Sequence, residues 1–75
     1  MKYITTQYAQ TLAEPTGDDP LHHGSRITTF DADSDEHASE VAERIAREYA
    51  RQIEHEHEGR SAVIYTFGPL FERIA

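Results

Sequence analysis

The fold is decided by residues 33–58, which read DSDEHASEVAERIAREYARQIEHEHE. Small and large apolar side chains recur there at i, i+4 spacing, a period typical of an amphipathic α-helix. They form two neighbouring rows: Val41, Ile45, Tyr49 and Ile53, and Ala38, Ala42, Ala46 and Ala50. We therefore expect one continuous helix over about 34–57 that buries this stripe against a sheet. The alanine row is small enough to let the two backbones approach closely.

The ends of this helix carry their own signals. Asp33 followed by Glu36 matches a capping box, with Asp in place of the usual Ser or Thr. Gly59 occupies a position that suits a C-terminal cap. A helix of this length measures about 37 Å, whereas a strand of eight residues measures about 27 Å. We therefore expect the helix to overhang its sheet.

The first strand is expected over about 2–12, which is rich in Thr, Tyr and Ile. Ile4, Tyr8 and Leu12 share one parity, so one face of this strand is apolar and the other is polar. The next segment, 13–24, contains two prolines and two glycines. This composition predicts a loop, and long loops frequently carry binding functions.

Two further strands are expected, over about 25–32 and 61–67. In the second strand Ile27 and Phe30 fall on opposite parities, which indicates either a bulge between them or cover on both faces. The third strand is largely apolar on both faces, as in a central strand or one that faces a partner. Residues 70–74 are compatible with a fourth strand or with one helical turn.

The element order β-β-α-β predicts an α+β fold in a single domain, residues 1–75. One long helix covers one face of a small antiparallel sheet of three or four strands. If the third strand lies beside the first, the spatial order is 2-1-3. A chain this short buries only about 60% of its unfolded surface, so a partner chain is a plausible supplement to the core. We expect a homodimer or partner contact through Ile64, Tyr65, Phe67 and Phe71.

Composition excludes several classes of protein. The chain has no cysteine, which removes disulfides and thiolate metal sites. No signal-peptide core and no apolar run near the ~20 residues of a membrane span is visible. We therefore expect a cytoplasmic, soluble protein without membrane contact. Because the chain begins with Met and shows no linker, we also expect a complete small gene product.

The net charge is −7. Such a field repels nucleic acid and anionic lipid and attracts basic surfaces. The alternative is that the charge only keeps a small protein in solution. The expected partner-binding acidic face comprises Glu14, Asp18, Asp19, Asp33, Asp35, Glu36, Glu40 and Glu43.

Three arginines, Arg44, Arg47 and Arg51, form a short basic strip on the helix. Acidic residues flank this strip, so it lacks the positive footprint that direct nucleic-acid binding requires. The spacing predicts ion pairs from Glu40 to Arg44 and from Glu43 to Arg47.

The histidines are weak metal-ligand candidates: His22, His23, His55 and His57. Adjacent or alternate histidines on a helix point in different directions, and helical zinc sites use i, i+4 spacing instead. A site could still form if the helix ends before His55, or if the loop meets the helix end across a dimer. A pH-sensing role is a further alternative, since His55 and His57 lie among carboxylates. The simplest interpretation is that all four are surface residues.

No nucleophile elbow and no glycine-rich phosphate loop is present. We therefore expect a protein that is not an enzyme, with no catalytic residues and no cofactor. The leading hypothesis is an interaction module, an inhibitor or adaptor, that docks on a basic, nucleic-acid-binding protein surface. The alternatives are a homodimeric structural or regulatory subunit, and a histidine-based metal or pH-sensing site. In size and charge the chain is similar to small phage-encoded inhibitors such as anti-CRISPR or anti-restriction proteins. This likeness covers general character and carries over no residues.

Overall fold

The computed structural model describes residues 1–12, 22–57 and 59–75. Its elements are β1 (Lys2–Thr11), β2 (His22–Asp31), α1 (Asp35–Glu56), β3 (Ala62–Tyr65) and β4 (Glu72–Arg73). The sheet has the order β2-β1-β3, β4 also pairs with β1, and every pair is antiparallel. The predicted α+β class and the 2-1-3 order are confirmed. Within the described part of the chain no helix is both long and apolar enough to cross a bilayer.

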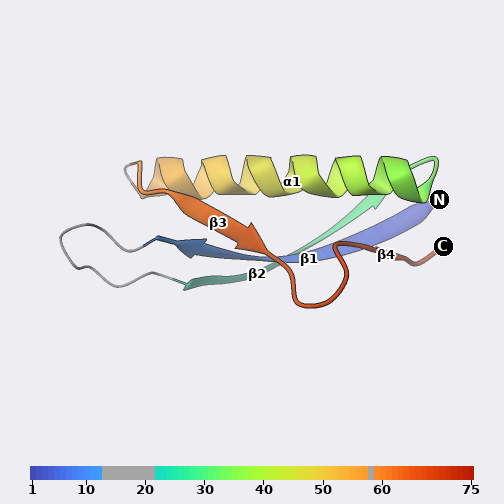
Figure 1. Cartoon of the computed structure of the whole chain (residues 1–75), viewed down its shortest axis with the longest axis horizontal. Coiled ribbons are helices and arrows are strands. Elements are labelled where there is room, and N and C mark those ends of the chain that lie inside the picture. The colour runs from blue at the N-terminus through green and yellow to red at the C-terminus, as the bar shows by residue number, and fades with distance from the viewer. Residues whose placement is uncertain (13–21, 58) are drawn as a thin grey trace.

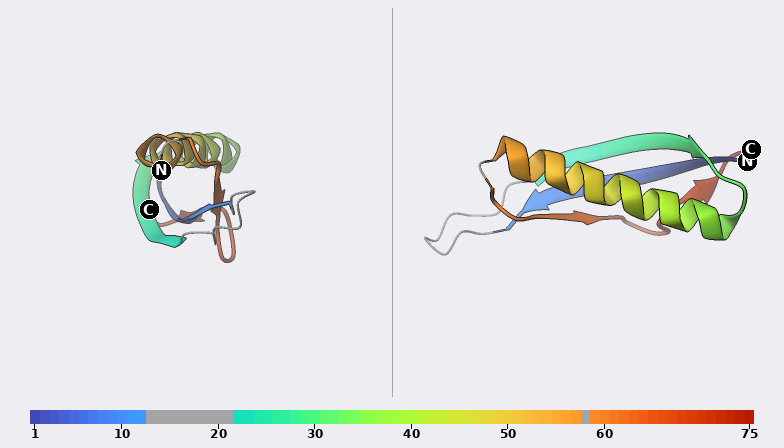
Figure 2. Two further views of the ribbon diagram at one scale, coloured as in Figure 1. Left: turned by 90° about the vertical axis from the view of Figure 1, so that its left-hand side faces the viewer. Right: turned by 90° about the horizontal axis from the view of Figure 1, so that it is seen from above.

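The central strand is β1. β3 pairs with its C-terminal half, Tyr8–Thr11, and β4 pairs with Tyr3 and Ile4 on the same side. Residues 70–74 therefore contribute a short strand rather than a helical turn. Between β3 and β4 the chain leaves the sheet edge and bends away from the helix (Figure 1). Seen end-on, the sheet curves under the helix, with β2 on one side and β3 on the other (Figure 2, left).

The helix is a single unbroken rod, as its periodicity predicts. Its buried residues are Ala38, Ala42, Tyr49 and Ile53, whereas Val41 and Ile45 are half-buried. The stripe is therefore rotated toward the alanine row. The expected overhang is wrong, because the 22 residues of α1 and the ten of β1 both extend about 33 Å at about 1.5 and 3.3 Å per residue.

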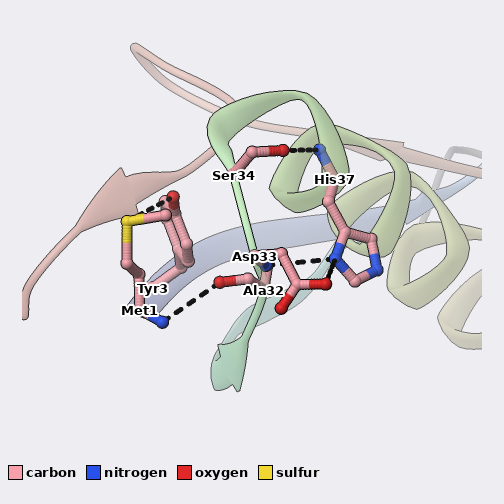
Figure 3. A network of polar contacts seen from close by, with 6 residues as sticks. All are labelled: Met1, Tyr3, Ala32, Asp33, Ser34 and His37. Carbon is pink, nitrogen blue, oxygen red and sulfur yellow. Dashed lines mark hydrogen bonds and ion pairs between the residues drawn. The ribbon is translucent and has the colours of Figure 1, made fainter.

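The N-terminal cap of α1 is Ser34 rather than the expected Asp33. Ser34 has an extended backbone (φ −156°, ψ 169°) and its hydroxyl accepts from the backbone N–H of His37 at 3.1 Å. The imidazole Nδ1 of His37 in turn accepts from the backbone N–H of Asp33 at 3.2 Å (Figure 3). The cap therefore lies one residue later than predicted, and His37 replaces Glu36 as the returning acceptor. Its bond goes to the N–H of Asp33, the residue before the cap, rather than to the cap residue as in a capping box.

At the other end the C-cap is His57, whose backbone N–H donates to the carbonyl of Ile53. The backbone N–H of Gly59 donates to the carbonyl of Glu54 at 2.7 Å, and Gly59 has φ 84°. This six-residue closure is the bond that a Schellman motif makes from its C″ amide. Gly59 therefore takes part in the helix end, but at C″ rather than at the predicted C′ position.

The second strand begins at His22, so the prediction that residues 22–24 belong to the loop is wrong. The pairing with β1 shifts register between Tyr8 and Gln10, and Gly24 has φ 76° nearby. This irregularity keeps the strand paired beyond the glycine. The remainder of the predicted loop, 13–21, lies outside the described residues.

The core under the helix is small and partly polar. One buried cluster joins Tyr3, Ala32 and Ala38, and the other joins Ala9, Tyr49 and Ile53. The β1 residues that face the helix are Tyr3, Thr5, Gln7, Ala9 and Thr11, all at most 1% exposed. The apolar parity of β1 therefore lies on the opposite, open face.

Polar atoms in this core are held by backbone carbonyls. The Gln7 side-chain Nε2 donates to the carbonyl of Ala42 in α1 at 3.0 Å, and the Thr5 hydroxyl donates to the carbonyl of Leu70 at 2.7 Å. The short alanine side chains let the helix approach closely enough for a strand side chain to reach its backbone.

Candidate interaction surfaces

The open face of the sheet carries Ile27, Val63 and Phe67, three of the six large apolar side chains that are exposed in the described residues. Antiparallel partners point to the same face, so Ile27 lies beside Thr6, and Tyr65 lies beside Tyr8. Ile27 is 64% exposed and Phe67 is 74% exposed. The apolar members of this open face are Ile4, Tyr8, Ile27, Val63, Tyr65 and Phe67.

Three rings form a cluster on this face. Tyr8 and Tyr65 stack with centroids 5.6 Å apart, and Phe67 meets Tyr8 edge-on at 4.8 Å and Tyr65 at 5.4 Å. The rings support one another, so Phe67 is held in place although most of its surface is in solvent. Beside the cluster is an open cavity of about 150 Å³, lined by Ile4, Thr6, Phe67, Pro69, Phe71 and Glu72.

The predicted contact residues divide between the two sides of the sheet. Tyr65 and Phe67 belong to the open face. Ile64 instead packs against the core cluster of Ala9, Tyr49 and Ile53, and Phe71 packs on the other cluster and also lines the cavity. The sequence prediction omitted Ile4, Tyr8, Ile27 and Val63 as contact residues. The shared parity of Ile4 and Tyr8 was a usable signal, since an apolar row not covered by the helix must face outward.

The acidic surface is built on the first turns of α1. The described members of the predicted set, Asp33, Asp35, Glu36, Glu40 and Glu43, are all exposed. Glu14, Asp18 and Asp19 lie outside the described residues. Glu36, Glu40 and Glu43 follow i, i+4, i+7 spacing on the side of the helix opposite Ala38 and Ala42. They form one row of carboxylates that faces away from the sheet.

The predicted ion pairs on the helix do not form. Among residues 1–12, 22–57 and 59–75 the ion pair is Lys2 with Asp31 at 3.2 Å. The Nδ1 atom of His37 lies 3.8 Å from the Asp33 carboxylate, but it accepts the backbone N–H of Asp33 and therefore carries no proton to donate. Glu40 and Glu43 therefore make no ion pair with the arginines one turn on. Exposed ion pairs of this type contribute little to stability, because two long side chains lose conformational freedom when they are held together.

Asp35 differs from the carboxylate row because it is anchored. The buried hydroxyl of Tyr3 donates to its Oδ1 at 2.8 Å. Burial raises the pKa of Tyr3 above 10.0, the hydrogen bond to Asp35 and its negative charge raise it further, and Arg73 acts in the opposite direction. The phenol therefore remains a neutral donor. This bond ties the start of α1 to β1.

Two of the predicted histidines come together. The rings of His23 and His57 lie 4.6 Å apart, tilted by 54°, whereas His55 is exposed on the last helical turn. The His22 side chain is outside the description. No cluster of three or more His, Cys, Asp or Glu that could hold a metal occurs in the described ranges. Two imidazoles alone fall short of the three or four protein ligands of a zinc site.

Comparison with known proteins adds no assignment. No protein-family model, curated protein or solved structure matches the chain significantly.

Proposed function

We propose that the chain is a non-enzymatic interaction module that docks on a basic protein surface through the carboxylate row of α1. The observation that supports this proposal is the row itself: Glu36, Glu40 and Glu43 are exposed, share one side of a rigid helix and make no ion pair within the described part of the chain. Carboxylates already engaged by arginines would have to break those pairs before docking. These three are available without that cost.

A protein surface that binds nucleic acid is the partner that such a row fits best. Successive row members rise by about 6 Å and 4.5 Å along the helix axis. A series of negative charges at these intervals can occupy a groove of lysines and arginines that otherwise holds phosphates. Opposite charge would speed the encounter and orient the two proteins. The module would then act as an inhibitor or adaptor of a nucleic-acid-binding protein.

The test uses the whole chain as immobilised bait for the proteins of its native host. A variant with Glu36→Gln and Glu40→Gln removes two charges from the row. A control with Glu48→Gln and Glu56→Gln removes two exposed charges elsewhere on the helix. We expect the wild-type chain and the control to capture a basic protein, the row variant to lose it, and duplex DNA to compete for the captured protein.

Salt provides an independent readout. Raising ionic strength from about 0.1 M to about 1 M shortens the screening length from ~10 Å to ~3 Å, so the affinity for the captured protein should fall steeply. Equal capture by the row variant and the wild-type chain, or an affinity unaffected by salt, would refute charge-led docking.

A further inference from the structure

The core takes some of the large apolar side chains, such as Tyr3, Tyr49 and Ile53, but it leaves others outside. Beneath the helix, β1 contributes Thr5, Gln7, Ala9 and Thr11 beside Tyr3, all buried. On the open face lie side chains of much greater apolar area, among them Ile27 and Phe67 at 64% and 74% exposed. Phe67 alone leaves about 110–185 Å² in water, taking 150–250 Å² for a whole aromatic side chain. A contiguous apolar face of this kind marks an interaction site.

We infer that a second copy of this chain covers the open face, related by a two-fold axis that passes near Thr6. This inference does not depend on the acidic docking function proposed above. Its basis is that one patch holds both a projection and a recess. Ile27 projects from β2, and the cavity of about 150 Å³ opens next to it. Thr6 joins the two, since it is the register partner of Ile27 and also lines the cavity.

A two-fold interface requires a self-complementary patch, in which a residue of one copy meets a different site on the other. With an axis between the projection and the recess, each Ile27 enters the cavity of the opposite copy. The size is suitable, because cavities of about 150 Å³ accept a group as large as benzene. Ile4, Phe67 and Phe71 give this recess apolar walls, and Thr6 and Glu72 give it polar ones. Phe67, fixed against Tyr8, would form the wall that closes over the inserted side chain.

Charge favours a second copy on this face over any other contact between copies. Each chain carries −7, and its carboxylate row lies on the far side of the helix from the sheet. Contact through the open faces places the two helices outermost, at the greatest separation that the fold permits. The open face itself carries little unpaired charge. Asp31 is paired there with Lys2, and among the described carboxylates of this face Glu72 alone makes no ion pair.

The open face follows the length of the sheet. Its two long strands, β1 and β2, have ten residues each and extend about 33 Å at about 3.3 Å per residue. Apolar members of the face lie on both of these strands and on β3, so a second copy would meet a continuous apolar surface.

The first experiment measures the mass of the particle by light scattering over a dilution series. We expect twice the 8.5 kDa of the chain for the wild type. Ile27→Glu should weaken dimerisation at least about thirtyfold, as loss of an interface hot spot does. Arg44→Gln makes the same change of charge on the outer side of the helix and should remain dimeric. A wild-type monomer at high concentration, or a dimer unaffected by Ile27→Glu, would overturn the inference.

A second measurement remains decisive if Ile27→Glu fails to fold. Because the chain has no cysteine, a single introduced thiol reports only on its own position. Packed sheets lie about 10 Å apart, which exceeds the ~7 Å between Cα atoms that a direct disulfide allows, so a short bis-maleimide serves as the cross-linker. Only residues near a two-fold axis lie this close to their own copies, so Thr6→Cys should give a covalent dimer, whereas Glu43→Cys should not. Failure of Thr6→Cys to cross-link faster than Glu43→Cys would refute the axis.

Discussion

Replacing Gln7 by leucine should stabilise the protein, although it removes a hydrogen bond. Gln7 is 1% exposed, and its Nε2 donates to the carbonyl of Ala42. Its Oε1 is buried and finds no partner among the described residues. The Ala42 carbonyl, as a helix acceptor, also receives the amide four residues on, so Gln7→Leu leaves no polar group orphaned.

The magnitude follows from two opposing terms. The lost hydrogen bond is worth about 0.5–1.5 kcal/mol, whereas removing an unsatisfied buried acceptor recovers about 1–3 kcal/mol. Leucine is close to glutamine in volume, so packing changes little. The net expectation for Gln7→Leu is a gain of about 1 kcal/mol, which raises Tm by about 4–8 °C in a domain of this size.

The assay is urea unfolding followed by far-UV circular dichroism, with all variants at one protomer concentration, since dimerisation shifts apparent stability. Gln7→Glu is the matched variant. It keeps the shape but buries a carboxylate, so it should be much less stable at neutral pH and recover as acid neutralises the group. A Gln7→Leu protein less stable than wild type by more than about 1 kcal/mol would show that the Oε1 acceptor is satisfied and that this account of the core is wrong.

Three further outcomes are expected. Ser34→Ala should cost about 0.5–2 kcal/mol in urea unfolding because the N-cap acceptor is lost, and Ser34→Asp should retain most of that stability; equal loss in both would contradict the cap. Ala42→Leu should cost about 1–3 kcal/mol through overpacking, whereas Ala50→Leu, at a half-buried site, should stay within about 0.5 kcal/mol. Burial and Asp35 raise the pKa of Tyr3, so its neutral form stabilises the fold below pH 10.0, and that contribution should disappear as pH rises through the higher folded-state pKa. Ultraviolet titration should show Tyr3 ionising last among the tyrosines. If the stability of Tyr3→Phe declined above pH 10.0 as much as that of the wild-type chain, this prediction would be wrong.

Some of the candidate surface could be recognised before any tertiary structure. The helical period of residues 33–58 places Glu36, Glu40 and Glu43 on the side opposite the alanines, and the structure agrees. The parity of Val63, Tyr65 and Phe67 likewise places them on a single face of the sheet. The recess beside Ile27 could not be predicted, because its walls come from β1, from β4 and from the segment between β3 and β4.

Local periodicity therefore determined the helix, the strand segments and the pairs of residues that share a face, because backbone geometry alone sets those repeats. It left open which face of β1 would meet the helix. Alternation along a strand separates two sets of side chains but does not say which set points toward the helix. Tertiary packing decided this. The alanine row brings α1 so close to the sheet that Thr5, Ala9 and Thr11 fit beneath it, with Gln7 bonded to the helix backbone, and the bulkier Ile4 and Tyr8 are left on the outside. One further bond is also tertiary: the hydroxyl of Tyr3 donates to Asp35 and ties the start of the helix to β1.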